Sequence, residues 1–205
     1  MNLDFSVIQN QKNLLAFSAG VDSSALFFLL LEQSIPFDIA IVNYNLRVQS
    51  KDEVFYAKNL ASKYKKNIFL KETKIENISN FEKNARDIRY KFFDEIILEN
   101  SYENLITAHQ LNDKLEWFMM QLSKGAGLVE LIGFNEFEQK ENYKIYKPLL
   151  NITKKKLENY LKINNHKYFV DQSNFDEKYK RNYFRHTFSN KFLENFSSGV
   201  KKSFE

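Results

Sequence analysis

Short apolar segments alternate with longer segments of helical periodicity along most of this chain, and this alternation restricts the fold more than any other feature. Residues 14–17, 37–43, 68–71, 105–108 and 143–146 have the length and composition of buried strands. Strands separated by helices pair in parallel through right-handed crossovers, which places helices on both faces of the sheet. We therefore predict an α/β fold with a mainly parallel five-stranded sheet, whose ligands bind at the carboxyl ends of the strands.

Helices are predicted in the connections between these strands. Apolar residues recur at helical spacing on two long segments; they are Phe81, Ala85, Ile88, Phe92 and Ile96 on one, and Leu111, Leu115, Phe118, Met119 and Leu122 on the other. Residues 50–53 and 79–82 have the spacing of capping boxes, so helices are expected to begin at Ser50 and Ser79. Further helices are expected up to Leu31 and over residues 153–164.

The composition indicates one globular domain over residues 1–205. Hydrophobic residues make up 43% of the chain and aromatic residues 16%, which is enough for one substantial core. The chain contains no cysteine, which excludes disulfides, thiolate zinc sites and sulfur carried on a cysteine. The N-terminus lacks a signal-peptide pattern, and the longest apolar stretch, residues 25–31, is too short to span a bilayer. We expect a cytoplasmic protein without a membrane partner.

The segment Ser18-Ala19-Gly20-Val21-Asp22-Ser23 stands where the first strand ends and the first helix begins. Free backbone amides and the helix dipole favour a phosphate at such a position, and small residues let the backbone approach it. The serine hydroxyls can donate to phosphate oxygens, and Asp22 can hold a magnesium ion that bridges them. An ordinary capped turn explains so short a segment equally well.

This segment resembles the SGGxDS signature of the PP-loop ATP pyrophosphatase superfamily, with Ala19 in place of a glycine. The resemblance implies a Rossmann-like fold of the adenine nucleotide alpha hydrolase type. It also implies that ATP is a substrate, is cleaved between its alpha and beta phosphates, and adenylates an oxygen atom of a second substrate. Residues 18–23 would then contact ATP, and Asp22 would hold Mg²⁺.

Further segments, in the same order along the chain, resemble the tRNA(Ile)-lysidine synthetase family. They are residues 41–47 for HVNHGLR, 85–90 for ARxxRY, 108–117 for AHHxDDQxET, 124–128 for RGSGL, 147–150 for RPLL, and 171–174 with Arg181, Asn182 and Arg185 for DxSN followed by RNxxR. The resemblance covers residues 14–202. The sequence departs from these motifs at Ile41, Tyr44, Asn112 and Trp117.

The resemblance implies an ATP-dependent carbon–nitrogen ligase that forms AMP and pyrophosphate. Its partners would be ATP, free L-lysine and an isoleucine tRNA with a CAU anticodon, whose wobble cytidine has to leave its stack to be reached. The oligomeric state is left open, with a homodimer as one alternative. The C-terminal tRNA-binding domains that are usual in the family are expected to be absent from residues 1–205.

Asp113 and Glu116 form the candidate acidic site. They are three positions apart at a strand-to-helix junction, so both carboxylates can face one side of the first helical turn and attract a cation. The resemblance implies that this cation is the ammonium group of the substrate lysine. The alternative is that both acids only interact favourably with the helix dipole.

Two arginines and a histidine complete the candidate site. The resemblance places Arg89 at the ATP phosphates or the adenylate, and Arg181 near the nucleotide and the tRNA; planar guanidinium groups suit phosphate. His109 is expected to line the nucleotide pocket without an assigned proton role. The candidate catalytic residues are therefore Asp22, Arg89, Asp113, Glu116 and Arg181.

Basic residues gather in two places, although a net charge of +4 alone favours no particular partner. Lys154, Lys155 and Lys156 are interpreted as a solvated helix face. The second group is expected to contact RNA; it comprises Lys178, Lys180, Arg181, Arg185 and Lys191.

Two other functions stay open at this point. A PP-loop tRNA thiolase would normally use cysteines, which argues against it in a chain that has none. A non-catalytic nucleotide- or tRNA-binding module is favoured by the departures from the family motifs. Pyrophosphate release would separate an enzyme from such a module.

Overall fold

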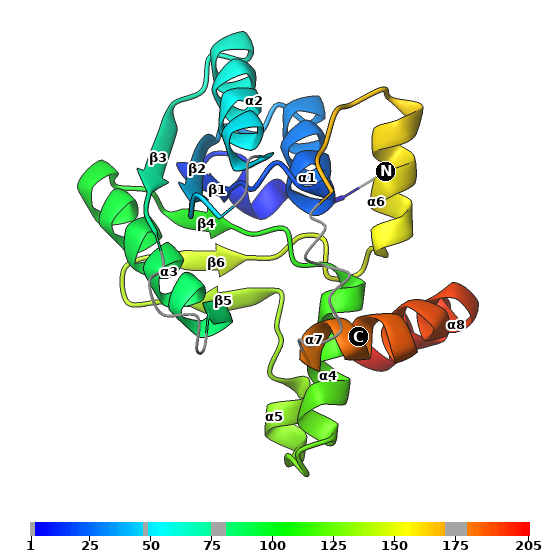
Figure 1. Ribbon diagram of the computed structural model, residues 1–205. Coiled ribbons are helices and arrows are strands. Elements are labelled where there is room, and N and C mark those ends of the chain that lie inside the picture. Colours follow the sequence, from blue (N-terminus) through cyan, green and yellow to red (C-terminus); the bar gives the residue numbers. More distant parts are fainter. Residues whose placement is uncertain (1–2, 47–48, 75–80, 171–179) are drawn as a thin grey trace.

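The sheet has six strands, one more than the sequence predicts, and helices cover both of its faces (Figure 1). The computed structural model describes residues 3–46, 49–74, 81–170 and 180–205. The strands are β1 Asn13–Ala16, β2 Asp38–Asn43, β3 Ile68–Glu72, β4 Asn104–Ile106, β5 Phe137–Gln139 and β6 Lys144–Tyr146, in the order β3-β2-β1-β4-β6-β5. All pairings are parallel except that of β5 with β6. The predicted mainly parallel α/β fold is confirmed.

The prediction of five strands was wrong because β5 carries no burial pattern. All three of its residues are exposed, so it lacks the apolar alternation by which a half-buried strand is recognised. The strand forms the edge of the sheet, where Phe137 pairs with Tyr146 of β6 and their rings stack 4.6 Å apart.

Successive side chains of the central strands enter two different cores, as the alternation of a strand requires. Leu15 of β1 and Ile39 of β2 belong to the larger core, and Leu14 and Ala40 belong to the core on the opposite face. Helices α1 Val21–Glu32, α2 Gln49–Lys63 and α6 Lys154–Ile163 cover the larger core, and α3 Phe81–Asn100 covers the other. The expectation of helices on both faces is confirmed.

A group of helices projects beside the sheet (Figure 1). It comprises α4 Leu111–Leu122, α5 Leu128–Ile132, α7 Lys180–Phe184, the π-helix Arg185–Ser189 and α8 Asn190–Phe204. Leu111 and Leu115 of α4 pack with Leu193 and Val200 of α8 in a third, small core. A short 3₁₀ helix, η1 Ser6–Ile8, precedes β1. None of the helices that the structure describes has the length and apolarity needed to cross a membrane.

The helix starts differ from the predicted capping boxes. Helix α2 begins at Gln49, so Ser50 lies inside the first turn and its predicted capping role is wrong. The other predicted box begins at Ser79, which lies outside the described residues. A capping box does form at α4: the Gln110 side chain accepts the backbone N–H of Asn112 at 2.6 Å, and the Asp113 carboxylate accepts that of Gln110 at 3.0 Å.

Candidate functional site

The loop between β1 and α1 has the geometry of an anion-binding site. Gly20 is the N-cap of α1 and has no side chain with which to satisfy the first backbone N–H groups of the helix. The hydroxyl oxygens of Ser18 and Ser23 lie 3.1 Å apart, and Ser23 Oγ also accepts the backbone N–H of Ser18 at 3.2 Å. Uncapped amides, hydroxyls and the positive end of the helix dipole therefore meet at one place.

Ala19 gives this loop its sharp turn. Its φ of 59° lies in the left-handed region, where the glycine of the family signature would carry no steric penalty and an alanine is strained. The methyl group is fully buried in the larger core. The loop is also held from outside, because the carbonyl of Ala19 accepts the backbone N–H of Phe169 at 2.9 Å.

A cavity of about 430 Å³ lies against the loop and is of the size that small-molecule ligands occupy. It lies at the carboxyl ends of β1, β2 and β4, the edge where the sequence predicts that ligands bind, and beside the point where the strand order changes direction. The loop contributes Ser18, Gly20, Val21, Asp22 and Ser23 to the lining, and basic side chains enter from α3, α6 and the C-terminal helices. These basic residues are Arg89, Lys154, Arg181 and Arg185.

The carboxyl group of Asp22 is the acidic group of the loop. Its Oδ1 is buried and has no hydrogen-bond partner among the described residues. Burial, and after it the negative charge of Asp113, raises the pKa of Asp22 to about 7, while Lys154 and Arg185 oppose the rise. A buried carboxylate oxygen without a donor is an atom that a cation can satisfy.

The residues of the loop fit a magnesium ion that is bound together with a ligand. The described residues contain no group of three or more metal-ligating side chains, so a magnesium ion would have Asp22 as its carboxylate ligand. Mg²⁺ at nucleotide sites is commonly held by one or two carboxylates, with phosphate and water completing its octahedron.

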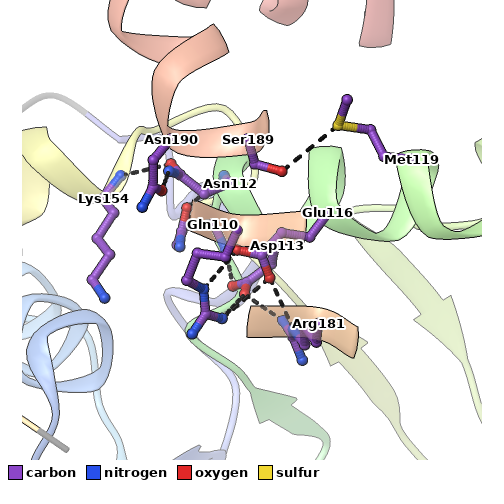
Figure 2. A network of polar contacts seen from close by, with 10 residues as sticks. Gln110, Asn112, Asp113, Glu116, Met119, Lys154, Arg181, Ser189 and Asn190 are labelled. Carbon is purple, nitrogen blue, oxygen red and sulfur yellow. Dashed lines mark hydrogen bonds and ion pairs between the residues drawn. The ribbon is translucent and has the colours of Figure 1, made fainter. Parts of the chain in front are cut away.

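Asp113 and Glu116 bind two arginines of the C-terminal helices, of which Figure 2 labels Arg181. Arg181 donates from Nη2 to Asp113 Oδ1 at 2.5 Å and from Nε to Glu116 Oε2 at 2.9 Å. Arg185 donates from Nε to Glu116 Oε1 at 2.8 Å and from Nη2 to Oε2 at 3.1 Å. The expectation that both acids face a cation is met in this structure by guanidinium groups of the chain itself.

These acids lie behind the arginines rather than in the cavity lining. Glu116 has no exposed surface and Asp113 is 8% exposed, whereas the side chain of Arg181 is 39% exposed. Burial alone would raise the pKa of Asp113, but Arg181, His109, the Gln110 amide and Arg185 together hold it below its ordinary value. Both carboxylates are placed one side chain away from a ligand in the cavity.

His109 lines the cavity, and its predicted contact with a nucleotide stays a prediction. Its Nδ1 lies 2.9 Å from the Thr107 hydroxyl, and its ring packs edge-on against Phe134 with centroids 5.3 Å apart. Burial lowers the pKa of His109 to about 4, with Asp113 acting in the opposite direction. The imidazole is therefore neutral near pH 7 and contributes no charge to the site.

Arg89 extends from α3 into the lining of the cavity and is exposed. One turn further along the helix, Phe93 is 2% exposed and anchors α3 in the core that this helix covers. No hydrogen bond or ion pair ties Arg89 to another described residue, so its guanidinium is available to a ligand. Its predicted contact with phosphate stays a prediction.

A family model described as the PP-loop domain matches residues 3–192. This chain belongs to the PP-loop family. The match includes the loop at residues 18–23, all six strands of the sheet and both arginines of the acidic network. The family membership that the signature indicated is confirmed.

Within the PP-loop family, the chain is similar to proteins named tRNA(Ile)-lysidine synthase. It is 51% identical over 200 residues to the protein of Campylobacter jejuni strain RM1221, a match that covers 97% of this chain and 62% of the relative. The protein of Helicobacter hepaticus is 50% identical over 204 residues, covering 97% and 48%. That of Helicobacter pylori strain 26695 is 46% identical over 199 residues, covering 97% and 58%. The chain thus spans about half to three fifths of the length of these relatives.

Solved structures confirm the PP-loop fold at low sequence identity. A tRNA thiolase from Methanococcus maripaludis superposes with a TM-score of 0.80 at 19% identity, over 98% of this chain and 73% of that protein. The NH₃-dependent NAD synthetase of Campylobacter jejuni gives a TM-score of 0.51 at 16% identity, over 97% and 86%. At these identities the likeness shows the fold alone.

The departures from the family motifs have structural roles. The Tyr44 hydroxyl donates to the backbone carbonyl of Ala85 at 2.7 Å and so ties the end of β2 to α3. Ile41 is 3% exposed in the larger core. Trp117 joins α4 to α5, because its indole N–H donates to the carbonyl of Glu130 at 3.2 Å. Ile41 and Tyr44 also line the cavity, whereas Trp117 holds α5 outside that lining.

Asn112, which replaces an aspartate of the family motif, joins the starts of three helices, α4, α6 and α8. Its Nδ2 donates to Asn190 Oδ1 at 2.9 Å, and its Oδ1 accepts the backbone N–H of Lys154 at 3.1 Å (Figure 2). An amide supplies both the donor and the acceptor that this position uses, whereas an ionised carboxylate is an acceptor only.

Several predicted residues lie outside the described residues. They are Arg47, Lys178 and residues 171–174. Two further residues of the site were given other roles from the sequence. Arg185 was expected to contact RNA, yet it lines the cavity and binds Glu116. Lys154 was interpreted as part of a solvated face, yet it lines the cavity.

Proposed function

We propose that this chain is the catalytic domain of a tRNA(Ile)-lysidine synthetase, which uses ATP to join free lysine to the wobble cytidine of a CAU-anticodon isoleucine tRNA. The observation that carries the proposal is the uncapped start of α1, which faces a cavity lined by Asp22 and by basic side chains. Relatives with this name are 50% and 51% identical to the chain, and the matches cover 97% of it. Cytoplasmic location is proposed on the same basis.

The proposed reaction has two displacements. Oxygen 2 of the cytidine forms a bond to the alpha phosphorus of ATP, and pyrophosphate leaves with the electron pair of the broken phosphorus–oxygen bond. The neutral ε-amine of lysine then forms a bond to carbon 2 and gives up one proton to solvent, and AMP leaves with oxygen 2 and the electron pair of the broken carbon–oxygen bond. Neither displacement needs a protein nucleophile, which agrees with a chain that has no cysteine.

The loop and the surrounding cations have the charge that the first displacement needs. The amides and hydroxyls of residues 18–23 would hold the phosphates, and Arg89 and Arg181 would offset charge that develops on them. Mg²⁺ bound to Asp22 would supply electrostatic stabilisation of the same phosphate oxygens. The neutral imidazole of His109 would form part of the wall without taking a proton.

For the lysine we propose that Asp113 and Glu116 supply the negative charge that its amine-bearing end needs. Arg181 already occupies these carboxylates, and it is the more exposed of the two arginines, with 39% of its side chain accessible against 14% for Arg185. Lysine would therefore approach from the cavity side and share the acidic charge with Arg181. This arrangement keeps the acids from being left buried without a counter-ion.

The test is a reaction of the chain with ATP, Mg²⁺, lysine and a transcript of isoleucine tRNA that carries a CAU anticodon. Mass spectrometry of the digested tRNA should show one cytidine heavier by lysine less one water. Release of pyrophosphate should depend on the tRNA. Binding of ATP and tRNA without pyrophosphate release would instead establish a non-catalytic module.

Sulfur transfer is the rival reaction within the fold, since the structure superposes well on a tRNA thiolase. These 205 residues carry no cysteine for a persulfide or an iron–sulfur cluster. Including sulfide in a parallel reaction and searching for thiolated nucleoside would decide between the two products.

A further inference from the structure

Lys154 differs from the two lysines that follow it. It is half-buried in the lining of the cavity, whereas Lys155 and Lys156 are exposed. Its backbone N–H is fixed by Asn112 Oδ1 at 3.1 Å, and its side chain points away from Asn112 and Asn190 (Figure 2). The anchor therefore uses the main chain and leaves the ammonium group to the cavity.

The position of Lys154 is electrostatically unfavourable without an anion nearby. All three lysines stand in the first turn of α6, which contains no acidic residue, and positive charge at a helix N-terminus opposes the helix dipole. The Lys154 ammonium makes no hydrogen bond or ion pair with another described residue. Glu158, one turn further along α6, adds negative charge to the same region but forms no ion pair with it.

Lys154 lines the same cavity as the nucleotide loop and affects its carboxyl group. Among the positive charges around Asp22, it has the largest effect against the rise of that carboxyl's pKa, larger than that of Arg185. Asp113 and Glu116 offset the charges of Arg181 and Arg185. The ammonium group of Lys154 has no such ion pair with an acid among the described residues. A polyanion bound over the loop would meet it directly.

We propose that Lys154 is a phosphate-binding residue of this site, whose ammonium group donates to the phosphates of ATP that leave as pyrophosphate. The inference rests on the proposed function for the identity of the nucleotide. Those phosphates carry most of the charge of ATP, and a lysine on them leaves the alpha phosphorus open to the attacking cytidine oxygen. The interpretation of residues 154–156 as a solvated face holds for Lys155 and Lys156 only.

The experiment is calorimetric titration of the full chain with ATP, pyrophosphate and AMP, each with Mg²⁺. Lys154→Ala should weaken the binding of ATP and pyrophosphate by about ten- to a hundredfold, the range of a charge-assisted hydrogen bond, and change that of AMP by less than about twofold. Lys154→Arg should retain most of the affinity. Lys155→Ala is the matched control, with the same loss of charge one residue away.

Folding should not confound the comparison, because the bond from Asn112 to the Lys154 backbone survives the substitution; thermal unfolding of each variant checks this. Unchanged pyrophosphate affinity in Lys154→Ala overturns the inference, and so does an equal loss in Lys155→Ala, which would indicate a general charge effect. If Lys154→Ala selectively loses affinity for pyrophosphate but the parent chain forms no lysidine, the proposed function alone is overturned. A chain that binds neither ATP nor pyrophosphate would overturn both.

Discussion

The carboxylate of Glu116 accepts Nε of Arg181 at 2.9 Å, across 65 positions of sequence and with no surface of Glu116 exposed to water. Arg185 binds the same carboxylate, so α4 and the C-terminal helices are joined by charges that depend on each other. Removing one partner of a buried ion pair leaves the other without compensation, which is the costly case.

Glu116→Ala should therefore lower the free energy of unfolding by about 3–5 kcal/mol. Urea denaturation measures this change. The matched control is Glu205→Gln, because Glu205 pairs with Lys201 at 3.5 Å on the surface of α8 with half of its side chain exposed. That variant should lose less than about 0.5 kcal/mol. Equal effects at the two positions would show that burial of the network contributes nothing.

Lysine use should depend on the acidic pair more than adenylation does. We predict that Asp113→Asn slows the lysine-dependent step at least about tenfold more than pyrophosphate release, because an ammonium group entering a partly desolvated site needs negative charge. Single-turnover measurements of the two steps test this. If both steps fall together, the carboxylates act only by holding Arg181 and Arg185, which are the groups nearer the cavity.

Asp22 gives the chain without ligands a stability that falls as pH rises. Its pKa is about 7 in the folded chain against an ordinary 3.8, so between these values the folded state binds more protons than the unfolded state, and stability decreases with pH. Asp22→Asn removes this penalty. It should raise the free energy of unfolding at pH 8 by up to roughly 4 kcal/mol, and by much less at pH 5.

The measurement is chemical denaturation at both pH values in the presence of a chelator. His109 acts in the opposite direction, because its pKa of about 4 makes the folded state lose stability as pH falls below its ordinary 6.5. In the unsubstituted chain the two effects on the free energy of unfolding partly cancel as pH changes. Only the difference in stability between the Asp22→Asn variant and the parent isolates the effect of Asp22. A difference that is independent of pH would contradict the raised pKa.

The salt dependence of tRNA binding should come from exposed cations rather than from the arginines of the network. Lys180 and Lys191 are exposed, so a double alanine variant should reduce the slope of log affinity against log salt by a little under two. Arg185→Ala should leave the slope nearly unchanged and lower stability instead, because its guanidinium is held by Glu116. Filter binding at several salt concentrations tests both. An unchanged slope in the double variant would make these lysines a solvated face.

Local patterns were sufficient for the features that depend on neighbouring residues. The three-residue spacing of Asp113 and Glu116 predicted two carboxylates that face one cation, and the structure places them so. The nature of that cation was not predictable, because Arg181 is 65 positions from Glu116 and 68 from Asp113, and it reaches them only when the C-terminal helices pack against α4. A contact over such a separation leaves no trace in local periodicity.

Helix starts show the same division. Ser50 has the residue type and spacing of a cap, yet the helix begins one residue earlier. Gln110 is an unusual capping residue, so the box that forms at α4 was not recognised. Lys154 was misinterpreted because a run of lysines is identical in composition whether its first member faces water or a cavity.

The parallel bridge between Gly20 and Phe169 sets how far this chain tolerates changes in length. An insertion or deletion in residues 164–168 would shift Phe169 out of register with the loop and with the carbonyl of Ala19 that it bonds. The turn at residues 140–143 follows an edge strand whose residues are all exposed. Its contact with another helix, from the Tyr143 hydroxyl to Asp94 of α3, is made by the last residue of the turn, so residues can be added before it without moving that contact. Homologous chains should therefore vary in length at the second turn and keep it constant at the first.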